Sequence, residues 1–161
     1  MKRNMKFSNA GQALLMDMEG FSDKPYRCSA GHLSIGYGHK IKPGEVFDTI
    51  TEGSAIMMMM KDAKPFENFI NYYIPVDLTQ NQFDALVIFL FNIGEGNFQK
   101  STVYTNLKLG HFEEATIPWS KWINVSEWVI DPVTGIEKKV LVPVKGLITR
   151  RQREIELFRR K

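Results

Sequence analysis

One glutamate occupies a position whose chemistry follows from its surroundings. Glu19 falls at the end of an expected helix, directly before Gly20, so its carboxylate faces the negative end of the helix dipole. That position disfavours ionisation, and partial burial beside Phe21 and Tyr26 would act in the same direction. A carboxylic acid kept protonated near neutral pH suits a general acid, although a glutamate at a helix end can equally be a solvated surface residue.

Two further side chains with useful chemistry follow Glu19 at short intervals. Eight residues separate Glu19 from Cys28, and five separate Cys28 from Ser34. Cys28 is the only cysteine, so an intrachain disulfide is excluded. Its thiol is a poor base unless its pKa is lowered, so it could act as a nucleophile or simply fill a small buried space. Ser34 offers a hydroxyl that could hold a water molecule.

Short predicted elements carry these three residues. A first helix is expected to be capped by Ser8 or Asn9 and to end at the glycine after Glu19. The proline- and glycine-rich stretch that follows predicts two short strands, Pro25–Cys28 and Leu33–Tyr37. Residues 29–32 are the expected turn between them.

The rest of the chain is predicted to be mainly helical. Periodicity and capping patterns indicate helices over residues 51–72, 79–93, 101–109, 112–122 and 149–160. Pro65 is expected to kink or split the first of these, and the run Met57–Met60 within it is expected to face the core. Gly94-Glu95-Gly96 should break the second helix.

A strand, a turn and another strand over residues 126–142 predict a hairpin before the last helix. The fold class expected from these patterns is α+β, as one mainly helical domain over residues 1–161. A small antiparallel sheet follows the first helix and forms a β lobe at about residues 21–50. The helical lobe, about residues 51–161, contains the hairpin.

The composition excludes several classes of protein. The chain has 161 residues, 43% of them hydrophobic and 24% charged, as in ordinary globular domains. No apolar run follows the basic N-terminus, and none in the chain approaches the roughly 20 residues of a membrane span. We therefore expect no secretory signal peptide and a chain made in the cytoplasm. His32, His39 and His111 show no metal-ligand spacing with Cys28. No phosphate-binding or nucleic-acid motif is found, so we expect no metal, no cofactor and no nucleic-acid partner.

Positive charge is concentrated at the C-terminal end. The net charge is +3, but residues 138–161 contain nine basic and two acidic residues, a net +7. Such a segment either contacts an anionic polymer of a cell envelope or is a solvated helix face.

The stretch around Glu19 resembles the catalytic region of the phage-type lysozymes, or endolysins. That family has a Glu, then an Asp or Cys, then a Thr at these spacings, followed by Gly-Tyr-Gly-His. Here the same places hold Glu19, Cys28, Ser34 and the run Gly36-Tyr37-Gly38-His39. The similarity extends from about Phe7 to Phe158. It is weakest over residues 124–144, where this chain has its hairpin.

The resemblance implies a lysozyme-like fold and a division of roles. Glu19 would donate a proton to the leaving glycosidic oxygen, while Cys28 and Ser34 position or activate water on the opposite face. Inversion would follow by analogy, with roughly 6.5–9.5 Å between the two groups. Two departures affect the mechanism: Cys28 stands where Asp is commoner, and Ser34 where Thr is usual.

Further site residues are implied by the same resemblance. The expected substrate-binding residues are Tyr26, Gly38, His39, Phe91, Asn92 and Gly94. His39 is expected to orient the backbone near the cleft rather than to catalyse. Arg150 or Arg151 is expected to pair with Glu19 and hold it in place, although either could be a surface arginine.

The expected function is hydrolysis of the β-1,4 bond between N-acetylmuramic acid and N-acetylglucosamine in peptidoglycan. A lytic transglycosylase acting on the same bond is the first alternative, because it needs only the acid. A non-catalytic peptidoglycan-binding protein is the second. The resemblance further implies a monomer that reaches the cell wall after a holin permeabilises the host membrane.

Overall fold

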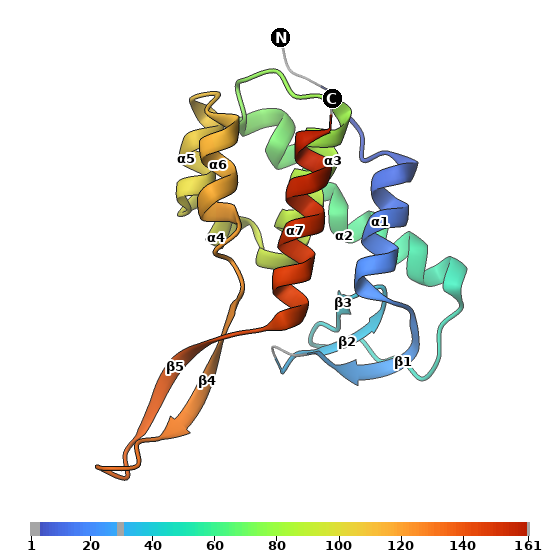
Figure 1. Cartoon of the computed structure of the whole chain (residues 1–161). Helices are drawn as coiled ribbons and strands as arrows, with labels where there is room; N and C mark the ends of the chain where they lie inside the picture. Colours follow the sequence, from blue (N-terminus) through green and yellow to red (C-terminus); the bar gives the residue numbers. More distant parts are fainter. Residues whose placement is uncertain (1–3, 29–30, 161) are drawn as a thin grey trace.

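Helices dominate the computed structural model, which describes residues 4–28 and 31–160 (Figure 1). They are α1 (Asn9–Glu19), α2 (Glu52–Tyr73), α3 (Gln80–Ile93), α4 (Glu95–Gln99), α5 (Thr102–Lys108), α6 (Phe112–Trp119) and α7 (Lys145–Arg159). The strands β1 (Ser22–Arg27), β2 (Leu33–Gly36) and β3 (His39–Lys40) form an antiparallel sheet in that order. The strands β4 (Asn124–Ile130) and β5 (Glu137–Pro143) form a separate hairpin. The predicted α+β class is confirmed.

The first helix begins and ends where the capping residues predict. The Ser8 side chain accepts a hydrogen bond from the Gly11 N–H, which makes Ser8 the N-cap. At the other end, Gly20 has φ +70° and closes the helix directly after Glu19. The helix therefore delivers the Glu19 side chain to the start of the sheet.

The three-stranded sheet is larger than the sequence predicts. β1 starts at Ser22 rather than at Pro25, and a register shift between Ser22 and Tyr26 accommodates the proline on this edge strand. β3 has two residues and was not predicted, because so short a strand has no detectable alternation. Ser29 and Ala30, in the predicted turn, lie outside the described residues.

The core is built around α3. Phe83 and Ala85 to Leu90 have no exposed surface, so this helix is buried on most sides. Thr79 and Gln82 form the predicted capping box at its start. α3 packs against α1, α2 and α7, so it connects the elements that meet at the site.

Two predictions about α2 are corrected. Pro65 does not split the helix, because Phe69 and Ile70 beyond it are buried and tertiary packing holds the second half in place. The methionines do not all face the core: Met59 is buried, whereas Met57 and Met60 are 73% and 47% exposed. The buried stripe follows the helical period and therefore takes only one of these three.

Other details of the helices also differ from the predictions. Gly94, with φ +79°, ends α3 as expected, but the chain becomes helical again at once and forms α4. α7 starts at Lys145, four residues before the expected Thr149. The additional turn matters for function because it carries part of the cavity lining described below.

The β4–β5 hairpin projects away from the helical body (Figure 1). Its large apolar side chains are mostly exposed, among them Trp128 at 68% and Val133 at 91%. The predicted hairpin is confirmed. Within residues 4–28 and 31–160, no helix is both long and apolar enough to cross a membrane.

Candidate active site

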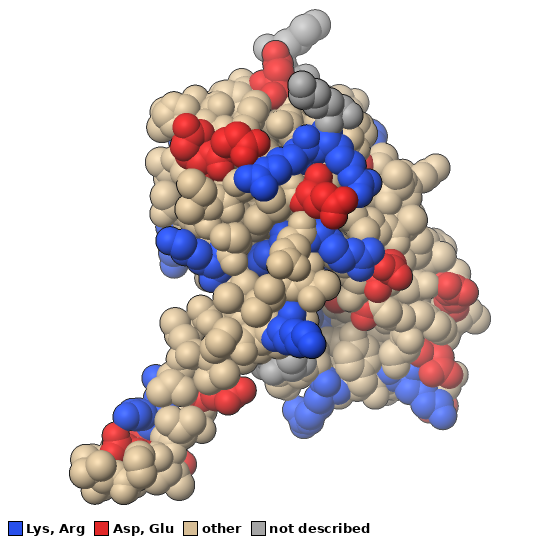
Figure 2. All heavy atoms as spheres, in the orientation of Figure 1, with Lys and Arg blue, Asp and Glu red and all other residues tan. Residues whose placement is uncertain are grey.

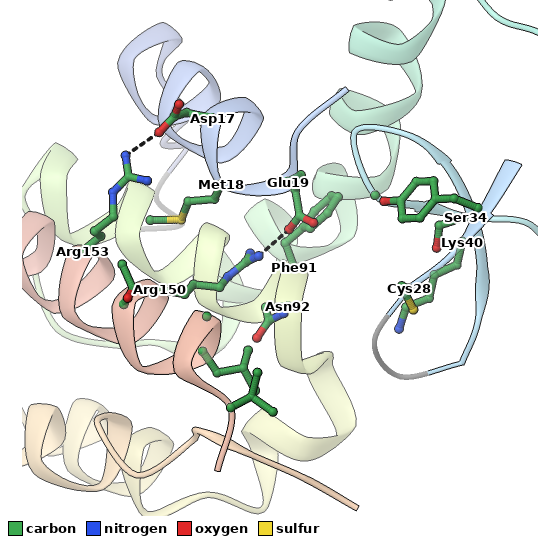
Figure 3. A pocket seen from close by; sticks show the side chains of 16 residues that line it. Asp17, Met18, Glu19, Cys28, Ser34, Lys40, Phe91, Asn92, Arg150 and Arg153 are labelled. Carbon is green, nitrogen blue, oxygen red and sulfur yellow. Dashed lines mark hydrogen bonds and ion pairs between the residues drawn. The ribbon is translucent and has the colours of Figure 1, made fainter. Parts of the chain in front are cut away.

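A cavity of about 520 Å³ brings together the end of α1, the three-stranded sheet, the end of α3 and the start of α7. It is lined by Asp17, Met18, Glu19, Tyr26, Cys28, Ser34, Gly38, Lys40, Phe91, Asn92, Val144, Gly146, Leu147, Thr149, Arg150 and Arg153. Figure 3 shows Glu19 and Arg150 on one side and Cys28, Ser34 and Lys40 on the other. All three residues proposed for catalysis therefore face one cavity.

Glu19 is held by an arginine from the far end of the chain. Arg150 Nη1 donates to Glu19 Oε1 at 2.6 Å, and the two side chains are only 10% and 16% exposed. A charge-assisted hydrogen bond with this much shielding fixes the direction of both groups. Of the two arginines expected near Glu19, Arg150 makes the contact.

Gly38 lies against the other oxygen of the same carboxyl group. A β-carbon added at Gly38 would come within 2.8 Å of Glu19 Oε2. Gly38 also has φ +78°, in the left-handed region that glycine occupies without strain. Glu19 is thus confined between the Arg150 guanidinium and the backbone that joins β2 to β3.

A buried carboxylate lies behind Arg150. Arg150 Nε donates to Glu154 Oε1 at 3.1 Å, and Trp119 Nε1 donates to Glu154 Oε2 at 3.0 Å. Glu154 has no exposed surface, and this burial raises its pKa, while the charges of Arg151 and Arg150 act in the opposite direction. The network fixes one end of the guanidinium whose other end holds Glu19.

The opposite wall is a row of side chains across the sheet. Tyr26 of β1 pairs in register with Ser34 of β2, and Ser34 pairs with Lys40 of β3. Residues paired in this way share one face of a sheet, and all three line the cavity. Burial, followed by the negative charges that Glu19 and Cys28 carry when ionised, raises the pKa of Tyr26. The Tyr26 phenol therefore lies within electrostatic reach of both.

Cys28 and Ser34 are positioned by backbone pairing. Cys28 directly follows β1; its N–H donates to the His32 carbonyl at 2.9 Å, and its carbonyl accepts from the Gly31 N–H at 2.8 Å. The side chain is half-buried and faces the cavity. Ser34 is only 2% exposed. A thiol and a hydroxyl therefore face a carboxyl group across the cavity.

Comparison with known proteins agrees with this geometry. The family model described as phage lysozyme matches residues 16–154. The chain belongs to the phage lysozyme family. An endolysin of Acyrthosiphon pisum secondary endosymbiont phage 1 is 35% identical over 154 residues, which are 96% of this chain and 98% of that relative. The enzyme is accordingly a peptidoglycan-hydrolysing endolysin and a lysozyme-type glycoside hydrolase.

This chain covers other relatives to different extents. The solved structure of an endolysin from Escherichia coli O157:H7 phage FAHEc1 superposes with a TM-score of 0.82 at 28% identity, covering 99% of this enzyme and 96% of that chain. An endolysin of Bacillus phage B103 is 31% identical over 156 residues. The enzyme spans about half, 54%, of the length of that relative.

Arg151 has a different position from its neighbour. It is buried beneath the site, where Nη2 donates to Asn92 Oδ1 at 2.5 Å and the guanidinium lies 4.9 Å from the centre of the Phe89 ring. Burial lowers the pKa of Arg151 to about 10. Arg151 therefore orients Asn92, a predicted groove residue of the enzyme, rather than Glu19.

His39 and Gly94 lie beside the main cavity rather than in its lining. Both line a smaller space of about 210 Å³, which shares Gly38, Lys40 and Phe91 with the main cavity. The His39 ring is 2.6 Å from Asp62 Oδ2 through Nδ1 and 3.0 Å from Glu45 Oε2 through Nε2. Both ring nitrogens are therefore engaged, and His39 ties the β3 backbone to α2.

Sequence reasoning missed several residues of this site. Lys40 was not singled out, because the two-residue strand that carries it was not predicted. The ion pair of Arg150 with Glu154 was also missed, although their spacing of four residues on a helix favours one. Val144 and Leu147 line the cavity because α7 begins earlier than predicted.

Proposed function

We propose that the enzyme cleaves the β-1,4 bond between N-acetylmuramic acid and N-acetylglucosamine, with Glu19 as the general acid. The observation that carries the proposal is the position of Glu19. It is a shielded carboxyl group, gripped by Arg150 and Gly38, that faces Cys28 and Ser34 across the cavity. In its protonated form, Glu19 transfers a proton to the glycosidic oxygen as the bond to the anomeric carbon breaks.

The second half of the proposal concerns the attacking group. A water molecule held by Ser34 and Cys28 attacks the anomeric carbon from the face opposite Glu19, giving up one proton to the Cys28 thiolate or to solvent. This route inverts the configuration at that carbon. In the other route, the Cys28 thiolate attacks first, and water then releases the sugar with retained configuration.

Product analysis separates these routes and tests the reaction itself. We expect new reducing ends, each carrying the elements of one water molecule, with the α configuration immediately after cleavage, as read by mass spectrometry and NMR. Anhydro-muramyl ends would contradict hydrolysis and indicate the transglycosylase, which the family assignment does not favour. Absence of any cleavage would indicate a binding protein.

Two substitutions at Cys28 complete this experiment. If Cys28 activates water, Cys28→Asp keeps hydrolysis with inversion, within about tenfold of the wild-type rate, since an aspartate carboxylate is ionised at neutral pH and can accept the proton of the attacking water. Cys28→Ser then slows the reaction by about a hundredfold without changing its stereochemistry. A β product from the wild-type enzyme, together with an inactive Cys28→Ser, would instead establish the thiol as the nucleophile.

The proposal extends to how the enzyme reaches its substrate. We infer that it is made in the host cytoplasm and acts as a monomer on the wall in the periplasm after a holin opens the membrane. Among the described residues, Lys139 and Lys145 have no ion pair, and they are available to contact an anionic envelope. The four arginines of α7 contribute less to such a contact, because each is paired with an acidic residue. Figure 2 shows acidic side chains among the basic ones.

A further inference from the structure

Lys40 differs from the other charged residues that line the cavity. Asp17 pairs with Arg153 at 2.6 Å, and Glu19 pairs with Arg150. Within residues 4–28 and 31–160, the Lys40 ammonium group has no ion pair with an acidic side chain. Among the described residues that line the cavity, Lys40 therefore carries a positive charge that no acidic side chain neutralises.

The direction of the Lys40 side chain is set by its strand. His39 is 6% exposed and is held through both ring nitrogens by Asp62 and Glu45, so it faces the interior. Successive residues of a strand point to opposite faces, and Lys40 therefore faces the cavity. Its register partner is Ser34, and Figure 3 shows both side chains on the wall opposite Glu19.

We propose that Lys40 is a specificity-determining residue that binds a carboxylate of the substrate beside the cleaved bond. The inference rests on the proposed function, because each requires a peptidoglycan strand to occupy the cavity. In that polymer the N-acetylglucosamine rings are neutral, and carboxylates belong to the lactyl group of the muramic sugar or to its peptide stem. An ammonium group on the wall that carries Ser34 and Cys28 thus distinguishes the anionic polymer from a neutral one.

The size of the effect follows from the exposure of Lys40. The side chain is exposed, so water screens its attraction for a carboxylate more than in a buried pair. We therefore expect loss of the charge to raise KM by about 1.5-fold to fivefold, the range of an exposed ion pair. The kcat should stay within about twofold, because Lys40 does not contact the atoms that exchange protons.

The test compares three variants. Lys40→Gln removes the charge, Lys40→Arg keeps it, and Lys24→Gln removes a charge from an exposed lysine of β1 in the same sheet but outside the cavity. KM and kcat are measured from the release of reducing ends. Only Lys40→Gln should raise KM on peptidoglycan. An equal rise in Lys24→Gln, or no rise in Lys40→Gln, would overturn the inference.

The choice of substrate identifies the carboxylate. On peptidoglycan with amidated carboxyl groups, wild type and Lys40→Gln should have equal KM values. On glycan strands freed of peptide, which retain only the lactyl carboxylate, a persisting KM penalty would assign Lys40 to that group, and its disappearance would assign it to the stem. A penalty that remains unchanged after amidation would overturn the role.

The inference and the proposed function fail in different ways. The masses of the wild-type products test whether the reaction is hydrolysis, and they do not depend on residue 40. The KM comparison reports charge recognition whether the products are reducing or anhydro ends. Folding of each variant is checked by its melting temperature, which should match wild type because the Lys40 side chain forms no ion pair with another described residue.

Discussion

At the scale of single residues, the position of Glu19 depends on the absence of a side chain at Gly38. A β-carbon there would lie 2.8 Å from Glu19 Oε2. We expect Gly38→Ala to displace the carboxyl group and to lower kcat at least tenfold, since a displacement of about 1 Å in a catalytic group can cost up to a hundredfold. The measurement is reducing-end release from peptidoglycan.

Gly44 provides the matched control. It also has a positive φ, +88°, but no atom lies within 4 Å of an added β-carbon. Both alanine variants should lose about 1 kcal/mol of unfolding free energy, from backbone strain in the left-handed region. Only Gly38→Ala should lose activity. Equal activity of the two variants would show that contact with Glu19 is unimportant.

The candidate catalytic residues could be predicted from the sequence where they lie close together along the chain. Glu19, Cys28 and Ser34 lie close together in the chain, and short elements bring them to one cavity as their spacing suggests. Arg150 and Glu19 are 131 positions apart, and from the sequence the partner of Glu19 could be restricted only to Arg150 or Arg151. The choice between them depends on the rotation of α7, which is set by burial of Arg151 and Glu154.

At the scale of elements, the turn of the β4–β5 hairpin is held by one aspartate. Asp131 accepts hydrogen bonds from the N–H groups of Val133 and Thr134, and Lys138 Nζ lies 2.7 Å from Asp131 Oδ2. The Lys138 hydrogen bond is the largest cause that lowers the pKa of Asp131 from 3.8 to about 2. The stabilisation is therefore complete above pH 3.8 and is lost as the pH falls through about 2.

Removing the lysine should shift that titration. In Lys138→Gln we expect the pKa of Asp131 to rise toward 3.8, as followed by NMR of its carboxyl carbon. Lys139→Gln is the control, because Lys139 pairs in register with Trp128 and not with the turn. A rise of the same size in both variants would mean that general charge, rather than the Lys138 contact, lowers the Asp131 pKa.

Helices and strands with strong periodicity or capping patterns could be predicted from the sequence. Whether a helix continues through a proline, or whether a very short strand forms, could not. The capping box of α3 and the cap of α1 are both local patterns, and both predictions are confirmed. Pro65 signals a helix break that packing overrides, and the two residues of β3 are paired only because β2 lies beside them. These outcomes depend on contacts between distant segments, which local patterns do not contain.

At the scale of the whole molecule, the site exists only when both parts of the fold are assembled. α1 supplies the candidate acid, α7 supplies the arginine that holds it, and the sheet supplies the facing wall. α3 packs against both α1 and α7 and sets the distance between them. At this scale the α+β class could be predicted from the sequence. The shape and lining of the cavity could not, because they depend on how distant segments pack together.

The central claim, that Glu19 is the general acid of a peptidoglycan hydrolase, is tested most directly by Glu19→Gln acting on purified sacculi. Glutamine keeps the size of the side chain but cannot donate the proton of a carboxylic acid. The account predicts that the rate of reducing-end release falls by at least about a hundredfold with the melting temperature little changed. Glu156→Gln, on the exposed side of α7, should retain wild-type activity. Near-wild-type release of reducing ends by Glu19→Gln would contradict the account.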